Sequence, residues 1–327
     1  MFGKADSEHA TVGWGMTSYN EGDEICGYCL SNRTGLPFTD LRETAKWRRT
    51  FPLTKEQFVA RFGEPRHPLL DSGLVTQQFF RIDIMHSFDC NGLTAIVAGS
   101  VLWHLVACPT DKAMRELGPT QDARLASINN KMAMYQSEHM TPSPMPRLAL
   151  QNLTLSQQSA SFACLHGVVI KAANTRHLMP FVSCLAHEYL TANDPMEISA
   201  LKVVDSLCKF YELIYTADMF LKTAEKRLCR DLLLRLGKHF QNAAYISRRN
   251  GGVLFYTTFK VHVCQHVAEQ AFMLNPRYLQ NYQDEGLVGR VAGIFKGCKS
   301  GPFRKVIQRS ALTKYIVGLC LKYHGLA

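Results

Sequence analysis

Apolar residues recur at helical spacing through much of the chain. Residues 92–107 are almost continuously apolar, which predicts a buried helix. Residues 111–140 show a polar helical pattern, and residues 158–190 and 195–245 show amphipathic helical periodicity. In the last of these, Leu201, Val204, Leu207, Tyr211 and Ile214 share one face. We therefore expect a core built mainly from helices.

Strand-like patterns are few. Residues 78–83 (QFFRID) predict a short strand, and residues 253–263 (VLFYTTFKVHV) predict a second one or, alternatively, lead directly into a helix carrying His262 and His266. In residues 1–75 glycine and proline break every apolar run, so this segment is predicted to be irregular. Within it, residues 41–49 could form a short helix capped by Thr39 or Asp40.

Together these patterns predict a helix-dominated α/β fold. Three prolines between positions 142 and 146 cannot continue a helix and mark a boundary. We divide the chain into an irregular segment with a CxxC pair (1–75), a core strand and helix (76–110), a helical segment (111–245) and a C-terminal part with a basic tail (246–327).

Composition narrows the class of protein. The 327 residues are 46% hydrophobic and 20% charged, which is typical of a folded globular chain and excludes a wholly disordered one. The formal net charge is +10, and no acidic residue follows Glu285, so the C-terminal end is a basic strip. The candidate phosphate contacts in this strip are Arg290, Lys296, Lys299, Arg304, Lys305 and Arg309. This charge favours a polyanionic partner, although a solvated surface would give the same pattern.

Nothing in the sequence indicates secretion or a membrane. The first 23 residues hold no apolar run of signal-peptide length, and the apolar stretch 93–107 is shorter than the roughly 20 residues of a membrane helix. Eleven cysteines, an odd number in a long chain, favour free thiols. We expect a nuclear or otherwise intracellular protein.

Two pairs of residues are candidate metal ligands. Cys26 and Cys29 form C-G-Y-C, a spacing that can supply two thiolates to one tetrahedral Zn²⁺. The other ligands would be histidines such as His9 or His67, or a remote cysteine; reduced thiols in a turn are the alternative. His262 and His266 stand four residues apart, so on a helix both rings share a face, which is either one wall of a site or an exposed surface. No glutamate follows the first histidine as in H-E-x-x-H metalloproteases.

Carboxylates are the other candidate site residues. Asp83 and His86 are three residues apart at the end of the predicted strand, and Asp89 follows; they could bind a divalent cation, or Asp83 could cap the next helix. Glu285 lies in a predicted first helical turn, where the helix dipole favours it, and directly precedes the basic strip. A carboxylate beside basic residues suits Mg²⁺ or Mn²⁺ chemistry on phosphates.

Taken in order, these segments resemble the C-terminal half of a CACTA (En/Spm-like) DNA transposase. The matching segments are C-G-Y-C at 26–29, Arg48-Arg49, His67-Pro68, D-I-M-H at 83–86, K-V-H at 260–262 with His266, and Y-Q-D-E at 282–285 with Gly289-Arg290. The resemblance spans residues 13 to 300. It implies an RNase H-like core split by an all-helical insertion, with Glu285 as the third catalytic acid and Asp83 and His86 as an accessory pair. The implied reaction is metal-dependent DNA cleavage and strand transfer.

The departures from that family bear on activity. Its first two catalytic aspartates lie upstream of the C-P-Y-C segment, and Asp6 and Asp23 stand in no strand-like context here. Lys46-Trp47 replaces a C-H pair, which removes expected zinc ligands, and Gly286 replaces an arginine. We expect a truncated or degenerate copy that is inactive alone, unless Asp83, Asp89 and Glu285 form the acidic triad.

Three hypotheses follow. The first is a transposase-derived, DNA-associated protein with an incomplete catalytic core, whose partners would be DNA, a second copy of the chain or a full-length transposase. The second is a helical scaffold or interaction protein in which Asp83, His86 and Glu285 are structural. The third is an intact nuclease dependent on Mg²⁺.

Overall fold

The computed structural model describes residues 3–5, 23, 25–64, 68–71, 75–157, 160–270 and 274–280. The chain divides into two compact units, Met1–Leu279 and Gln280–Ala327. The described residues belong to the first unit except Gln280, so the architecture below is that of the first unit. The four-segment division made from the sequence remains a prediction.

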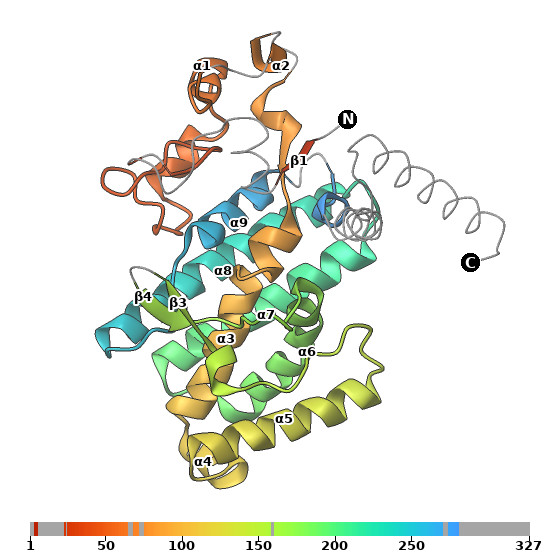
Figure 1. Cartoon of the computed structure of the whole chain (residues 1–327). Helices are drawn as coiled ribbons and strands as arrows, with labels where there is room; N and C mark the ends of the chain where they lie inside the picture. Colours follow the sequence, from red (N-terminus) through yellow and green to blue (C-terminus); the bar gives the residue numbers. More distant parts are fainter. Residues whose placement is uncertain are drawn as a thin grey trace, which may run out of the picture. The chain divides into compact units, whose positions relative to one another are not determined.

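The first unit is dominated by helices (Figure 1). Its α-helices are α1 (Lys55–Val59), α2 (Pro68–Asp71), α3 (Leu93–Ala107), α4 (Asp111–Leu117), α5 (Gln121–Glu138), α6 (Ala172–Tyr189), α7 (Pro195–Thr216), α8 (Thr223–Arg249) and α9 (Phe259–Gln270). Shorter helical turns are η2 (Lys46–Thr50), η3 (Gln77–Phe79), η4 (Met85–Asp89), η5 (Leu150–Asn152) and η6 (Pro276–Leu279). Helix-forming periodicity thus predicts the main character of the fold.

The described strands are short. β1 (Gly3–Ala5) pairs in parallel with β2 (Phe80–Ile82), with Gly3 opposite Phe80 and Ala5 opposite Ile82. β3 (Thr154–Gln157) and β4 (Ala160–Ala163) form an antiparallel hairpin in which Leu155 is opposite Phe162. The hairpin interrupts the segment that the sequence analysis expected to be wholly helical.

Helix α3 runs through the centre of the core. Its residues are buried on every side except around Trp103 and His104, and α5, α6, α7 and α9 all contact it (Figure 1). The helical stretch η4–α3, from Met85 to Ala107, is long and apolar enough to cross a membrane. However, 72% of its most apolar 18-residue stretch is buried inside the protein. Burial inside the protein explains this apolar composition, as the sequence analysis expected.

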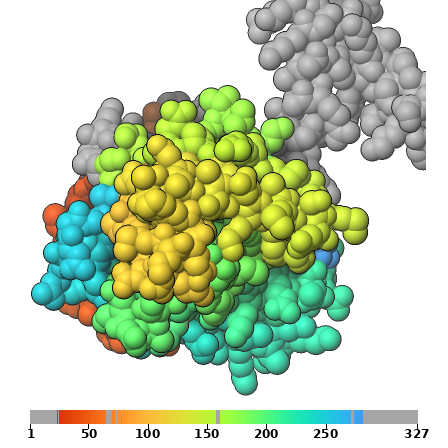
Figure 2. All heavy atoms as spheres, turned by 90° about the horizontal axis from the view of Figure 1, so that it is seen from below, coloured from red at the N-terminus to blue at the C-terminus, as the bar shows by residue number. Residues whose placement is uncertain are grey.

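Helix ends follow their local sequence. Thr110 caps α4 and Thr120 caps α5, each accepting a hydrogen bond from a backbone N–H three residues on. Gly118 between these helices has a φ of +130°, which breaks the expected single helix at 111–140 into two. α4 and α5 cover one end of the first unit (Figure 2). Asp194 caps α7, and Pro195 occupies the first turn, where its missing N–H costs nothing.

Three local predictions are wrong. Residues 160–163 form strand β4, paired with β3 at 154–157, and α6 begins only at Ala172, so the helix expected from 158 is wrong for the described residues before Ala172. Residues 253–258 are irregular and α9 starts at Phe259, so the strand at 253–263 is wrong and its alternative, a helix carrying both histidines, is confirmed. Phe255, at a φ of 53°, cannot continue a strand. The short helix expected at 41–49 is also wrong in its start. Asp40 pairs with Arg42 and does not cap a helix, and a helical turn, η2, begins only at Lys46.

The packing of α3 leaves no room for a side chain at Gly99. A Cβ there would lie 2.6 Å from the backbone of Cys164, and the neighbouring Leu165 N–H donates to the Ala95 carbonyl at 2.9 Å. The small residue therefore allows the chain directly after β4 to reach the helix backbone.

We expect Gly99→Ala to lower the free energy of unfolding by about 1–3 kcal/mol, because the backbone of Cys164 must move. Denaturant unfolding measures this effect. Gly35→Ala is the control, since a Cβ at that position meets its nearest atom at 3.9 Å and should change stability by less than about 0.5 kcal/mol. Equal effects of the two substitutions would contradict the close packing of α3.

Candidate metal centre

Cys26 and Cys29 lie in a tight turn near the start of the described chain. Both are buried, at 2% and 0% exposed. The Tyr28 N–H donates to Cys26 Sγ and the Ser31 N–H donates to Cys29 Sγ, each at 3.4 Å. These backbone donors orient both sulfur atoms to the same side of the turn and stabilise negative charge on them.

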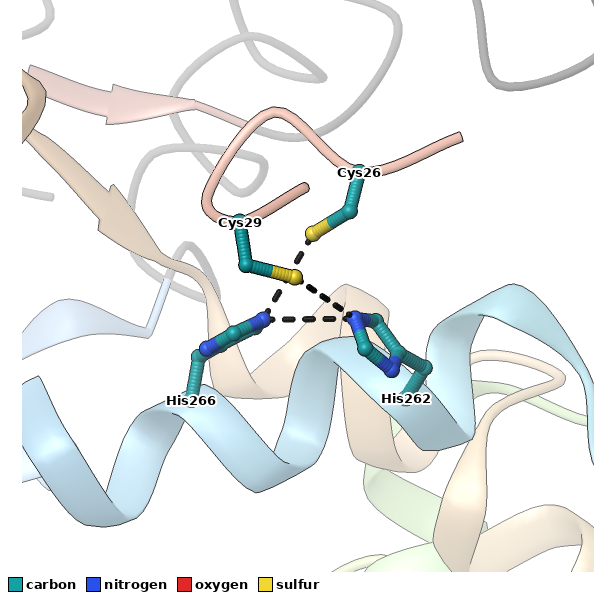
Figure 3. A group of neighbouring side chains, drawn as sticks. All are labelled: Cys26, Cys29, His262 and His266. Atoms are coloured by element: carbon teal, nitrogen blue, oxygen red, sulfur yellow. Dashed lines mark hydrogen bonds between the residues drawn. The ribbon is translucent and has the colours of Figure 1, made fainter. Parts of the chain in front are cut away.

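His262 and His266 lie one turn apart on α9. Both side chains are fully buried, so the alternative interpretation of an exposed helix face is wrong. α9 is buried along most of its length and contacts β2, η4, α3 and α8. The two rings therefore project from a rigid element toward the cysteine turn (Figure 3).

The two pairs converge on one point (Figure 3). Cys26 Sγ lies 3.5 Å from His266 Nε2, Cys29 Sγ lies 3.4 Å from His262 Nε2, and the two Nε2 atoms are 3.3 Å apart. A tetrahedral Zn²⁺ with ordinary Zn–S and Zn–N bonds requires S–N edges of about 3.6 Å and an N–N edge of about 3.3 Å. All four atoms lie within 4.8 Å of one another. The four residues could therefore hold a metal ion such as Zn²⁺.

The imidazole of His262 is oriented for this role. Its Nδ1 donates to the carbonyl of Phe38 at 3.1 Å, which places the proton on Nδ1 and leaves the Nε2 lone pair toward the sulfur atoms. Ser31 Oγ lies 3.0 Å from the same Nε2. Nδ1 of His266 is buried and has no hydrogen-bond partner among the described residues.

Aromatic rings enclose the histidines. The Trp47 ring meets His262 and His266 edge-on, with centroids 4.4 and 5.0 Å apart. Phe51 stacks on His266 at 5.0 Å. These rings exclude water and restrict rotation of both imidazoles, which preorganises the ligand atoms.

Electrostatics also suit a cation. Burial lowers the pKa of His262 below its usual 6.5, which favours the neutral, metal-binding imidazole. Burial acts to raise the pKa of Cys29, but the hydrogen bond with Cys26 and the nearby His266 lower it well below the usual range. Burial and the neighbouring Cys29 raise the pKa of Cys26. The isolated pair thus favours one thiolate, and a bound cation would favour two.

Asp83 and His86 also come together. Asp83, almost fully buried at the end of β2, pairs with Nδ1 of His86 and accepts the Met85 N–H at 2.9 Å. Asp89 is also buried but instead accepts the hydroxyl of Tyr211, which lies 2.6 Å from Thr94 Oγ1. Over the described ranges, groups of three or more ligand side chains close enough to share a metal include the Cys/His set but no set with Asp83 or Asp89.

The remaining sequence-predicted residues fall outside the described part of the chain. They are His9 and His67, the catalytic candidate Glu285, and the DNA-contact candidates Arg290, Lys296, Lys299, Arg304, Lys305 and Arg309. The predicted proximity of Asp83 to Glu285 is therefore neither confirmed nor contradicted.

The spacing of each cysteine or histidine pair marks it as a candidate for metal binding, but nothing local in the sequence shows that the two pairs meet across more than 230 residues. Lys46-Trp47, expected only to remove zinc ligands, has a second role, because Trp47 packs against both histidines. One observation in the sequence could have joined the two pairs: a CxxC pair and an HxxxH pair each supply two of the four ligands of a tetrahedral zinc site.

No family model matches the sequence, and neither the curated proteins nor the solved structures give a match. The functional conclusions below therefore depend on the geometry of this chain and on the resemblance of its motifs.

We expect bound Zn²⁺ to be retained at pH 7 and released on acidification, with a midpoint below about pH 6.5. The ligands bind only when deprotonated, so affinity falls as pH falls, and the lowered pKa of His262 shifts its protonation to more acidic conditions. Metal content after buffer exchange at stepped pH measures this. Retention that is independent of pH down to 4 would contradict the Cys/His ligand set.

Proposed function

We propose that Cys26, Cys29, His262 and His266 bind a structural Zn²⁺. The observation that carries this proposal is the match of three ligand–ligand distances to the edges of a zinc tetrahedron. Four protein ligands complete the coordination shell and leave no position for substrate, which is the arrangement of structural rather than catalytic zinc.

The ion would fasten the N-terminal segment to the helical core. Residues 25–64 are mostly loop and short helix. Most of their buried apolar side chains lie in two small clusters, one around Trp47 and one around Phe58 that also includes Leu70, Val75 and Phe80, while Leu41 belongs to the main core. Such a segment buries little apolar area of its own. The bond from turn to α9 would therefore contribute much of its stability.

We further propose that the chain is a transposase-derived, DNA-associated protein with an incomplete RNase H-like catalytic core, acting in the nucleus. Support comes from three motifs of the family resemblance that pack around α9. The C-G-Y-C turn and the K-V-H segment share the metal site, while Lys260 Nζ donates to the Cys90 carbonyl and Cys264 Sγ donates to the Ser87 carbonyl, next to D-I-M-H. Segments distant in sequence thus form one local structure.

Catalysis with Mg²⁺ receives less support than zinc binding. Asp83, the first residue of D-I-M-H, hydrogen-bonds with His86, and Asp89, three residues after that motif, hydrogen-bonds with Tyr211. A helical scaffold without a catalytic site remains the alternative function, favoured by this structural use of both carboxylates.

Cys29→Ser should abolish stoichiometric zinc and lower the free energy of unfolding by more than about 3 kcal/mol, because one ligand and the attachment of the N-terminal segment are lost. Elemental analysis and denaturant unfolding measure the two effects. A chelator should destabilise the wild type and leave the variant unchanged.

Cys264→Ser is the matched control. Cys264 is equally buried on α9, but its sulfur faces the Ser87 carbonyl, so zinc content should stay at the wild-type value. Zinc that persists in Cys29→Ser, or is lost equally in Cys264→Ser, would exclude the proposed ligand set.

Replacing Lys299, Arg304, Lys305 and Arg309 together by alanine should weaken DNA binding and flatten its salt dependence. Four lost phosphate contacts reduce the slope of log K against log salt by about 3.6 on duplex DNA. Binding titrations at several salt concentrations test this. If the slope is unchanged, the basic strip does not contact DNA.

A further inference from the structure

A groove lies between the loop that follows Asp40 and the exposed face of α8. Its volume is about 910 Å³, and Arg42, Glu43 and Thr44 line one wall. Side chains of α8, from Asp231 to Tyr245, line the other wall. This groove is separate from the metal centre and from the Asp83–His86 pair.

Cations in the groove are available to a ligand. Arg235 and Lys238 are exposed on α8, and neither forms an ion pair with another residue of the described ranges. Arg42 binds Asp40 with two hydrogen bonds of 2.8 Å, which fix its guanidinium while 66% of the side chain stays exposed. Burial and the positive charges of Lys202, Lys238 and Arg235 lower the pKa of His239 in the same groove, so the local potential is positive.

An exposed aromatic ring completes the wall formed by α8. Tyr245 is 60% exposed, and the guanidinium of Arg249 lies 5.7 Å from its ring centroid. A cation-lined groove with an accessible aromatic face is the arrangement by which proteins hold single-stranded nucleic acid: phosphates follow the cations and a base stacks on the ring.

The acidic groups in the groove favour a ligand with bases over a plain polyanion. Glu43 and Asp231 line it without forming ion pairs to Arg235 or Lys238. Carboxylates repel phosphates but accept hydrogen bonds from the amino groups of bases. The size of the groove, that of a small-molecule pocket, suits a few nucleotides of one strand rather than the face of a duplex.

The wall carrying Arg42 is held in place by the metal centre and by α8. The Leu41 N–H donates to Gln241 Oε1 of α8 at 2.9 Å, and Arg48 donates to Gln265 Oε1 of α9 at 2.8 Å. Trp47, between these contacts, packs on both metal-binding histidines. The groove is therefore formed before any ligand arrives, which lowers the entropic cost of binding.

We propose that this groove binds single-stranded nucleic acid, with phosphates on Arg42, Arg235 and Lys238 and a base stacked on Tyr245. The inference rests on the proposed DNA association and places part of that interface at a defined site on the first unit.

The test is fluorescence anisotropy of a labelled, mixed-sequence single-stranded 20-mer with the full, zinc-loaded chain. Arg235→Ala/Lys238→Ala should weaken binding at least tenfold and reduce the slope of log K against log salt by about 1.4. Tyr245→Ala should weaken binding about fivefold or more, and Tyr245→Phe should retain wild-type affinity, because the ring and not the hydroxyl is required.

Arg115→Ala/Lys209→Ala is the matched control, since it removes the same charge from exposed positions outside the groove and should stay within twofold of the wild type. If the groove variants bind like the wild type while the quadruple C-terminal variant loses binding, the groove is not the binding site. The proposed DNA association would then still stand. No binding by the wild-type chain would overturn both. Displacement of the oligonucleotide by polyglutamate as effectively as by unlabelled oligonucleotide would also overturn the assignment.

Discussion

The convergence of two sulfur and two nitrogen atoms from opposite ends of the described chain is the constraint on which the N-terminal segment, residues 25–64, depends. A C-x-x-C turn can be formed by local sequence alone, but it becomes a complete tetrahedral site only where α9 presents two imidazoles one turn apart. The turn and the Trp47 segment contact those imidazoles directly, and the loop bearing Arg42 is linked to them through the Phe38 carbonyl and to α8 through the Leu41 N–H. A cation in the site would thus cross-link a loop-rich segment to a helical core.

Helix α9 can serve as this anchor because the core holds it from several sides. Gln270 accepts the Ile82 N–H and donates to the Phe80 carbonyl, which joins the end of α9 to β2. Gln265, between the two histidines in sequence, fills the space left by Gly237 on α8, where a Cβ would lie 2.6 Å from its amide oxygen. The surrounding side chains therefore fix the positions of His262 and His266, and a metal ion would bind to a preformed half-site.

The sequence predicted what depends on local pattern and failed where tertiary context decides. The apolar run from Leu93 to Ala107 predicted a buried helix, and the C-x-x-C and H-x-x-x-H spacings identified all four candidate metal ligands. Residues 253–258 have strand-like composition but form no strand. Gly251 and Gly252 precede them, and the positive φ of Phe255 bends the chain before α9 begins. The partner of the C-x-x-C pair could not be predicted, because a contact across 233 to 240 residues leaves no local periodicity. Arg42 and Tyr245 carried no motif and became notable only when the fold placed their segments along one groove.

The most direct test of the metal centre is X-ray absorption spectroscopy at the zinc K-edge on the purified chain. Two sulfur ligands at about 2.3 Å and two nitrogen ligands at about 2.0–2.1 Å should form the first coordination shell. A shell made only of oxygen and nitrogen, or a protein that binds no zinc under reducing conditions, would contradict the account of how the N-terminal segment is held to the core.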